Sequence, residues 1–170
     1  MVPEPFLPHL GFEIIKMNIK LILVDIKDRV ILRDLINEYE KELLGIENPG
    51  EYKYLDSYWK KEDRYPFFVK IESVIGGFVL INSHTLIQKP GKNIAEFYIK
   101  KEFRNKGIGK MVAFKIFELF KGNWELRQLR EDISAQNFWR KIVSEHTQNN
   151  FQEKFLDTKD WCGPVQTFRN

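Results

Sequence analysis

The chain has 170 residues, of which 43% are hydrophobic, 14% aromatic and 30% charged. This composition predicts one folded domain with its own core and disfavours an intrinsically disordered chain. The 27 Lys and Arg residues against 24 Asp and Glu residues give a net charge of only +3, too small an excess to predict nucleic-acid binding.

The residue content also argues against a disulfide-linked, metal-binding or membrane-spanning protein. A single cysteine, Cys162, forms no internal disulfide, and with only three histidines a structural metal site is not expected. No apolar stretch approaches the ~20 residues that a membrane helix requires. We therefore expect a cytoplasmic protein without a metal or a membrane partner.

The N-terminal segment differs from the rest of the chain. Residues 1–16 contain three prolines and lack the basic start of a signal peptide, and Met17 directly precedes the first strand-like pattern. We expect residues 1–16 to be an extension outside the core and residues 17–170 to form a single domain.

The first half of the chain predicts a strand, two helices and a hairpin. Residues 18–25 are rich in Ile, Leu and Val, which indicates a strand buried over most of its length. A helical apolar period follows from Asp28, the predicted N-cap, to Gly45, and a short helix is expected over residues 55–63. Two further strands, residues 67–72 and 74–82, are separated by a short gap that favours a hairpin, and the Gly76-Gly77 pair in the second predicts a bulge or a close backbone approach.

The second half alternates strands and helices. Strict alternation in the strand predicted over residues 94–99 places Ala95, Phe97 and Ile99 on one face and Ile94, Glu96 and Tyr98 on the other. The remaining predicted elements are a helix at 107–121, a strand at 124–129, a helix at 133–143 and strands at 151–156 and 165–169. This order predicts an α/β or α+β fold with one mixed sheet.

A basic, glycine-containing segment lies where the strand at 94–99 leads into the following helix. The first amides of a helix lack intrahelical acceptors, and Gly107 and Gly109 carry no Cβ that would keep an anion away from them. Arg104, Lys106 and Lys110 add positive charge, so the segment fits a phosphate or pyrophosphate site. A solvated basic loop whose glycines serve turn geometry is the alternative.

Two common phosphate motifs do not fit this segment. A Walker A loop requires glycine at the position of Arg104 and Ser or Thr at that of Met111, and a dinucleotide fingerprint requires a third glycine at the position of Val112.

The segment resembles the acyl-CoA signature of the GNAT N-acetyltransferase superfamily. That signature, Arg/Gln-x-x-Gly-x-Gly/Ala after a strand, reads here as Arg104-x-x-Gly107-x-Gly109. The resemblance extends over residues 18–143 and implies a mixed, mostly antiparallel central sheet with helices on both faces.

A second stretch resembles the family's Asn-x-x-Ala-x-x-Phe-Tyr motif, with two departures. Asp132 stands where many members have an Asn that binds the pantetheine arm, and a helix cap is the favoured interpretation of this carboxylate. Trp139 stands where many members have a Tyr that acts as general acid. Because an indole N–H donates no proton at useful pH, this acid is absent.

The resemblance implies acetyl-CoA as cosubstrate, lying in a V-shaped opening between the strands at 94–99 and 124–129. Backbone groups of residues 97–99 would hold the pantetheine and polarise the thioester carbonyl, while the amides of residues 104–110 would hold the pyrophosphate. The implied cofactor-binding residues are Phe97, Ile99, Arg104, Asn105, Lys106, Gly107, Ile108, Gly109, Lys110 and Asp132.

Catalytic candidates lie on the strand at 94–99. Glu96 is the candidate general base, with an ordinary polar sheet position as the alternative, and Tyr98 is a candidate donor to the thiolate, with packing as the alternative. His84 and the aromatic run at 52–59 lie where acceptor substrates approach in this family. Solvation of His84, and anchoring of a mobile segment by the aromatic run, are the alternatives.

The resemblance implies an acetyl-CoA-dependent N-acetyltransferase that acts by direct attack of an amine. The acceptor would be a small-molecule amine or a peptide, and the protein a monomer or homodimer. A CoA-binding module of the same fold with little or no catalysis is the alternative, because Asp132 and Trp139 depart from the family pattern.

Overall fold

The computed structural model describes residues 17–170, and the predicted extension at residues 1–16 lies outside the described residues. The strands are β1 (Ile19–Leu23), β2 (Tyr65–Ile71), β3 (Val74–Asn82), β4 (Lys92–Ile99), β5 (Asn123–Arg127), β6 (Gln152–Asp157) and β7 (Cys162–Arg169). The α-helices are α1 (Arg29–Leu44), α2 (Ser57–Lys60), α3 (Ile108–Leu119) and α4 (Ile133–Thr147). The predicted elements are thus present, with ends shifted by a few residues.

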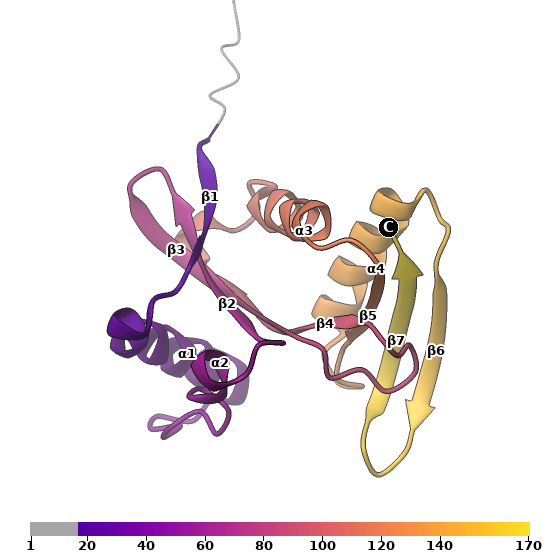
Figure 1. The fold of residues 1–170 in the computed structure, drawn as a ribbon, viewed down its shortest axis with the longest axis horizontal. Coiled ribbons are helices and arrows are strands. Elements are labelled where there is room, and N and C mark those ends of the chain that lie inside the picture. Colours follow the sequence, from indigo (N-terminus) through magenta and orange to yellow (C-terminus); the bar gives the residue numbers. More distant parts are fainter. Residues whose placement is uncertain (1–16) are drawn as a thin grey trace, which may run out of the picture.

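The strands form one seven-stranded sheet in the order β1-β2-β3-β4-β5-β7-β6. Every neighbouring pair is antiparallel except β4 and β5, which run parallel. Helices α1 and α2 cover one face, while α3 and α4 cover the other (Figure 1). The predicted mixed, mostly antiparallel sheet with helices on both faces is confirmed.

β1 differs from the prediction that it is buried over most of its length. Only Ile19 is buried, and Ile22 and Leu23 are 43% and 59% exposed. β1 lies at the edge of the sheet and pairs only with β2, so its apolar side chains are covered only in part.

The ends of α1 agree with the sequence pattern except for the cap. Gly45 ends the helix in the left-handed conformation, with φ of 65°, as expected for a glycine C-cap. Asp28 occupies the N-cap position without a capping side-chain bond. Instead, Asp25 accepts from the Lys27 amide and caps the short 3₁₀ turn that leads into α1.

Gly76 and Gly77 serve both of the roles predicted for them. The pairing of Val69 with Gly77 and of Lys70 with Ile75 leaves Gly76 as the extra residue of a bulge. A Cβ on Gly77 would lie 2.1 Å from the Tyr98 carbonyl oxygen, so only glycine permits this approach of β3 to β4.

A second bulge, at Ala95 in β4, overturns the strict alternation predicted for this strand. Leu80 pairs with Glu96 and Ile81 with Ile94, which leaves Ala95 without a partner. Ile94 therefore joins Phe97 and Ile99 on the α3/α4 face, and Ala95 packs with Tyr98 on the α1/α2 face.

β4 and β5 separate soon after they meet. They pair only at Lys92 with Trp124 and at Asn93 with Glu125. Beyond Asn93 one edge of β4 has no strand beside it, because the Ala95 bulge bends the strand at this point. The predicted V-shaped opening lies here.

Candidate active site

The larger of two cavities at this opening has a volume of about 830 Å³. Its walls come from β4, from the end of α1, from the turn before α3 and from the first half of α4. Its lining includes Glu42, Phe97, Tyr98, Ile99, Asn105, Gly107, Gly109, Asp132, Phe138 and Trp139. The structure therefore brings most of the predicted cofactor-binding residues to one cavity.

Unpartnered amides line the turn before α3. Helix α3 begins at Ile108, and Gly107 at its N-cap has φ of 75°, with Asn105 also left-handed at 59°. Within residues 17–170, no amide from 105 to 110 donates to another main-chain or side-chain group. Several N–H groups at the positive end of a helix are thus free to bind an anion.

The two glycines of the turn have different roles. A Cβ on Gly107 would enter open space, so glycine is required there only for the left-handed backbone and for ligand approach. A Cβ on Gly109 would lie 3.1 Å from the Phe138 ring. Gly109 therefore allows α3 to pack against α4, which the sequence alone did not distinguish.

The positive charges of the turn are largely balanced. Arg104 Nε donates to the Ile99 carbonyl at 2.7 Å, and its Nη2 donates to Glu42 of α1 at 3.0 Å. This contact raises the pKa of Arg104 and lowers that of Glu42. Lys110 pairs with Glu145, whereas Lys106 donates only to the Glu102 carbonyl.

Asp132 and Trp139 occupy structural positions on the wall of the cavity. Asp132 accepts from the Ala135 amide at 2.8 Å and so caps α4, as favoured by the sequence. Trp139 is 8% exposed, and its ring lies edge-on to Phe97 and Phe138 with centroids 5.0 Å away.

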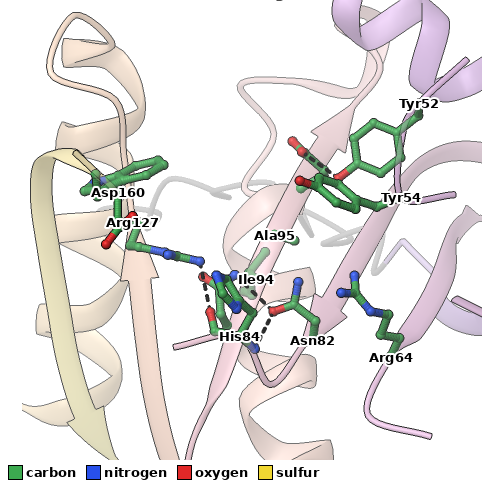
Figure 2. A pocket seen from close by; sticks show the side chains of 12 residues that line it. Tyr52, Tyr54, Arg64, Asn82, His84, Ile94, Ala95, Arg127 and Asp160 are labelled. Atoms are coloured by element: carbon green, nitrogen blue, oxygen red, sulfur yellow. Dashed lines mark hydrogen bonds between the residues drawn. The ribbon is translucent and has the colours of Figure 1, made fainter. Parts of the chain in front are cut away.

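The second cavity, of about 360 Å³, lies beside the first along β4. Ala95 and Glu96 line it, whereas the next residues of the strand, from Phe97 onward, line the larger cavity. Its polar and aromatic lining is drawn in Figure 2 and includes Tyr52, Tyr54, Arg64, Asn82, His84, Arg127, Asp160 and Trp161.

Glu96 is held by tyrosines on the α1/α2 face of the sheet. Tyr52 donates its hydroxyl to Glu96 Oε1 at 3.0 Å (Figure 2). Burial raises the pKa of Glu96, which the hydroxyls of Tyr39 and Tyr52 offset in part. Burial and the nearby Glu96 carboxylate in turn raise the pKa of both tyrosines.

Tyr98 is directed toward α1. Its hydroxyl donates to Glu38 at 3.1 Å and to Glu42 at 3.3 Å, and burial with these carboxylates raises its pKa. Glu96 and Tyr98 share the predicted face of the strand. They line different cavities, however, Glu96 the smaller one and Tyr98 the larger one.

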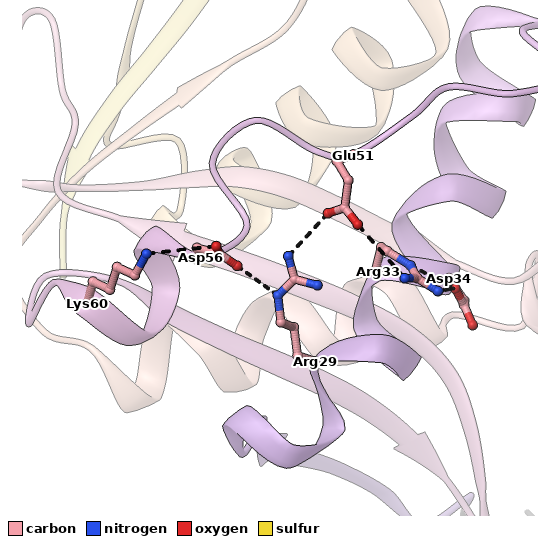
Figure 3. Close-up of polar contacts among 6 residues, drawn as sticks. All are labelled: Arg29, Arg33, Asp34, Glu51, Asp56 and Lys60. Carbon is pink, nitrogen blue, oxygen red and sulfur yellow. Dashed lines mark hydrogen bonds and ion pairs between the residues drawn. The ribbon is translucent and has the colours of Figure 1, made fainter.

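The segment that carries Tyr52 and Tyr54 is anchored by ion pairs (Figure 3). Arg29 of α1 binds Asp56 at 2.7 Å and Glu51 at 3.2 Å, and Arg33 lies 3.8 Å from Glu51. Exposed pairs of this kind add little stability, but several together fix the position of the loop between α1 and α2.

Glu125 fixes the other loop of this cavity and was not singled out from the sequence. It is fully buried and accepts from the amides of Leu86 and Ile87 at 2.8 Å and of Gln88 at 3.2 Å. Arg127 lies 3.8 Å from Glu125 and donates to the His84 carbonyl at 3.0 Å. Its sequence context does not mark it, because β5 alternates polar and apolar residues and Glu125 looks like an ordinary polar position.

A family model described as acetyltransferase (GNAT) family matches residues 32–143, more than half of the chain. The chain belongs to this family. No curated protein matches the sequence.

Solved structures of acetyltransferases share the fold at low sequence identity. A GNAT-family acetyltransferase from Staphylococcus aureus Mu50 is 16% identical, with a TM-score of 0.63 over 89% of this chain and 99% of that one. The PaiA N-acetyltransferase of Thermoplasma acidophilum, in complex with coenzyme A, is 16% identical, with a TM-score of 0.62 over 91% and 100%. The aminoglycoside acetyltransferase AAC(6')-Ib with ribostamycin and coenzyme A is 16% identical, with a TM-score of 0.67 over 89% and 93%.

Residues 17–170 contain neither a candidate membrane span nor a candidate metal cluster. None of their helices combines the length and hydropathy needed to cross a bilayer, and no group of three or more His, Cys, Asp or Glu residues is arranged to hold a metal ion.

Proposed function

We propose that this member of the GNAT family transfers an acetyl group from acetyl-CoA to a small-molecule amine by direct attack. One observation carries the proposal: β4 passes from the cavity lined by Glu96 into the cavity lined by Phe97 and the amide-rich turn. A base for the amine and a site for the acyl donor thus lie next to each other on one strand.

The larger cavity has the features that a CoA-type cosubstrate requires. The unpartnered amides of residues 105–110 fit the pyrophosphate, and Gly107 leaves open space in front of them. The free edge of β4 at residues 97–99 fits the pantetheine, next to the ring of Trp139. The cosubstrate supplies an activated acetyl thioester.

Glu96 takes the proton in this proposal. An ammonium near pKa 10 must lose a proton before its nitrogen can form a bond to the acetyl carbon. Burial raises the pKa of Glu96 and makes the carboxylate a stronger base than an exposed one. Glu96 keeps this first proton while the neutral amine attacks the acetyl carbon. The C–N bond forms, the C–S bond breaks and the thiolate leaves, and the nitrogen gives its second proton to solvent.

No described side chain is well placed to protonate that thiolate. Trp139 has only an indole N–H, and Tyr98 directs its hydroxyl to Glu38 and Glu42. We therefore assign this proton to solvent, and Tyr98 stays a predicted donor without support from the geometry.

The proposal is tested by acetyl transfer to a panel of amines, with products detected by mass spectrometry, and by calorimetry with CoA. Gly107→Ala places a Cβ in front of the free amides and should weaken CoA binding about tenfold, equal to ~1.4 kcal/mol. Gly122→Ala is the matched control, because Gly122 also has positive φ and open space around its Cβ position but lies outside both cavities. Equal CoA affinity in the two variants would contradict the proposed site.

A CoA-binding module without efficient transfer is the second candidate. The absence of a well-placed acid among the described residues favours it. CoA binding without acetylation of any amine in the panel would support this candidate over the enzyme. A cytoplasmic location and a monomeric or homodimeric state remain predictions.

A further inference from the structure

Arg64 lines the smaller cavity and forms no ion pair with any described residue. Arg64 precedes β2 and stacks on two tyrosines, with its guanidinium carbon 5.4 Å from the Tyr58 ring centroid and 6.0 Å from that of Tyr54. Among residues 17–170, no carboxylate pairs with Arg64, and its Nε is buried without a hydrogen-bond acceptor. A buried guanidinium N–H without an acceptor is costly, so a ligand that accepts from it gains binding energy.

Other donors face the same space. Asn82 uses its Oδ1 to accept from the His84 amide at 2.9 Å, which leaves its amide nitrogen directed into the cavity beside Arg64 (Figure 2). Trp161 Nε1, across the cavity, is also buried without an acceptor among the described residues. Two donors of the lining, Arg64 Nε and Trp161 Nε1, are therefore available to a ligand.

The carboxylates near this cavity do not neutralise Arg64. Glu96 accepts a hydrogen bond from Tyr52 and forms no ion pair with Arg64, and Glu125 lies 3.8 Å from Arg127 instead. Asp160 is exposed and lies on the wall opposite Arg64 (Figure 2). Among the described residues, the guanidinium of Arg64 thus has no carboxylate within ion-pair distance.

The geometry points to an acceptor that carries a carboxylate together with its amine, such as a free amino acid, with the carboxylate bound by Arg64 and Asn82. This inference rests on the proposed function. A planar guanidinium matches a carboxylate with two parallel hydrogen bonds, and a cavity of about 360 Å³ suits a small molecule. A polycationic acceptor of the aminoglycoside type would instead bring positive charge against Arg64, which disfavours it.

The test compares free amino acids with their carboxamides, which keep the amine and lose the negative charge. Arg64→Gln should lower kcat/KM about 10- to 100-fold for the amino acids that are acetylated and leave kcat/KM for the carboxamides within about twofold. Arg64→Lys keeps the charge without the planar pair of donors and should fall between. Arg140→Gln, which removes an arginine of α4 that pairs with Glu153 away from the cavity, is the matched control.

For each substrate type, kcat/KM of the variant is divided by that of the wild type. This ratio cancels the effect of amidation on the basicity of the amine, because both proteins receive the same substrate. The inference is overturned if the wild-type protein prefers carboxamides or polycationic amines, or if Arg64→Gln lowers both substrate types equally. CoA affinity of Arg64→Gln reports its folding and should match that of the wild type.

Failure of the proposed function gives a different result. If CoA binds but no amine is acetylated, thermal unfolding with CoA present still measures ligand binding. Amino acids should then raise the Tm of the wild type and not that of Arg64→Gln, and no rise in the wild type would refute the carboxylate site.

Discussion

At the scale of single residues, Glu96 combines a functional and an energetic property. Its ionised form is disfavoured by burial, although Tyr52 donates a hydrogen bond to it and the hydroxyl of Tyr39 also lowers its pKa. A carboxyl whose pKa is raised in the folded state contributes to stability at pH below its unfolded value. This contribution is lost as the pH rises through the folded value. Above its unfolded pKa, Glu96 therefore costs the fold stability.

Glu96→Gln should lower activity and raise stability at the same time. The amide oxygen still accepts from Tyr52, but the base is lost, so kcat should fall about 10²-fold or more. The Tm at neutral pH should rise, by about 2–4 °C for each kcal/mol relieved. Steady-state kinetics and calorimetry measure the two effects.

The pH dependence of the wild type completes this prediction. As the pH falls, kcat/KM should decline through the raised pKa of Glu96, and Glu96→Gln should lack this acid limb. Glu118→Gln, at an exposed position of α3, should behave as wild type. A lower Tm and an unchanged kcat in Glu96→Gln would remove Glu96 from the mechanism.

Single residues were predictable where their role depends on near neighbours. The caps at Asp132 and Gly45 and the turn at residues 104–110 follow from local spacing. The partner of Arg104 is Glu42, 62 residues away, and no local pattern indicates such a contact. The role of Arg64 has no local mark for the same reason, because only the fold brings it to one cavity with Asn82.

At the scale of elements, the two bulges show what a sequence can and cannot reveal. Gly76 and Gly77 mark the first bulge, because a missing side chain inside a strand is visible in the sequence. Ala95 gives no such mark. The sequence therefore predicts strict alternation of faces through residues 94–99, although the bulge interrupts it. The edge position of β1 has no mark in the sequence either. An Ile- and Leu-rich segment predicts a buried strand whether it has one neighbouring strand or two.

The loop at residues 83–91 depends on one buried carboxylate of β5. Glu125→Gln replaces a negatively charged oxygen that accepts main-chain N–H groups with an NH₂ group that faces them. Because a buried charge-assisted network is broken, we expect a loss of about 3–5 kcal/mol in the free energy of unfolding. Denaturant unfolding measures this loss, with Glu118→Gln as the exposed control.

Hydrogen exchange locates the same effect. The amides of Leu86, Ile87 and Gln88 should exchange faster in Glu125→Gln than in the wild type. Unchanged exchange at these amides, with equal stability, would show that the carboxylate does not hold the loop.

At the scale of the whole molecule, the sheet is weakest where β4 meets β5. Layers and element order were predictable from periodicity and from the family resemblance. The strand order β5-β7-β6 was not, because antiparallel insertion of the last strand leaves no mark in the sequence.

CoA should stabilise the protein along this junction. A ligand at 100 times its Kd adds about 2.7 kcal/mol, which corresponds to a rise in Tm of roughly 5–10 °C for a chain of this length. With CoA, amide exchange should slow at residues 97–99 and 105–110 and change little in the β1–β2 pair. Protection centred on β1 and β2 would place the ligand elsewhere, and Gly107→Ala should show a smaller shift at equal CoA concentration.

The pairing of Arg104 with Glu42 and of Lys110 with Glu145 has a kinetic consequence. Attraction of an anionic ligand from a distance depends on net charge, and carboxylates of α1 and α4 cancel most of it at the turn. Long-range steering is therefore weak, and the association rate should depend little on ionic strength. Affinity at such a turn comes from short hydrogen bonds to fixed N–H groups, so it is expressed in slow dissociation and long residence of the ligand.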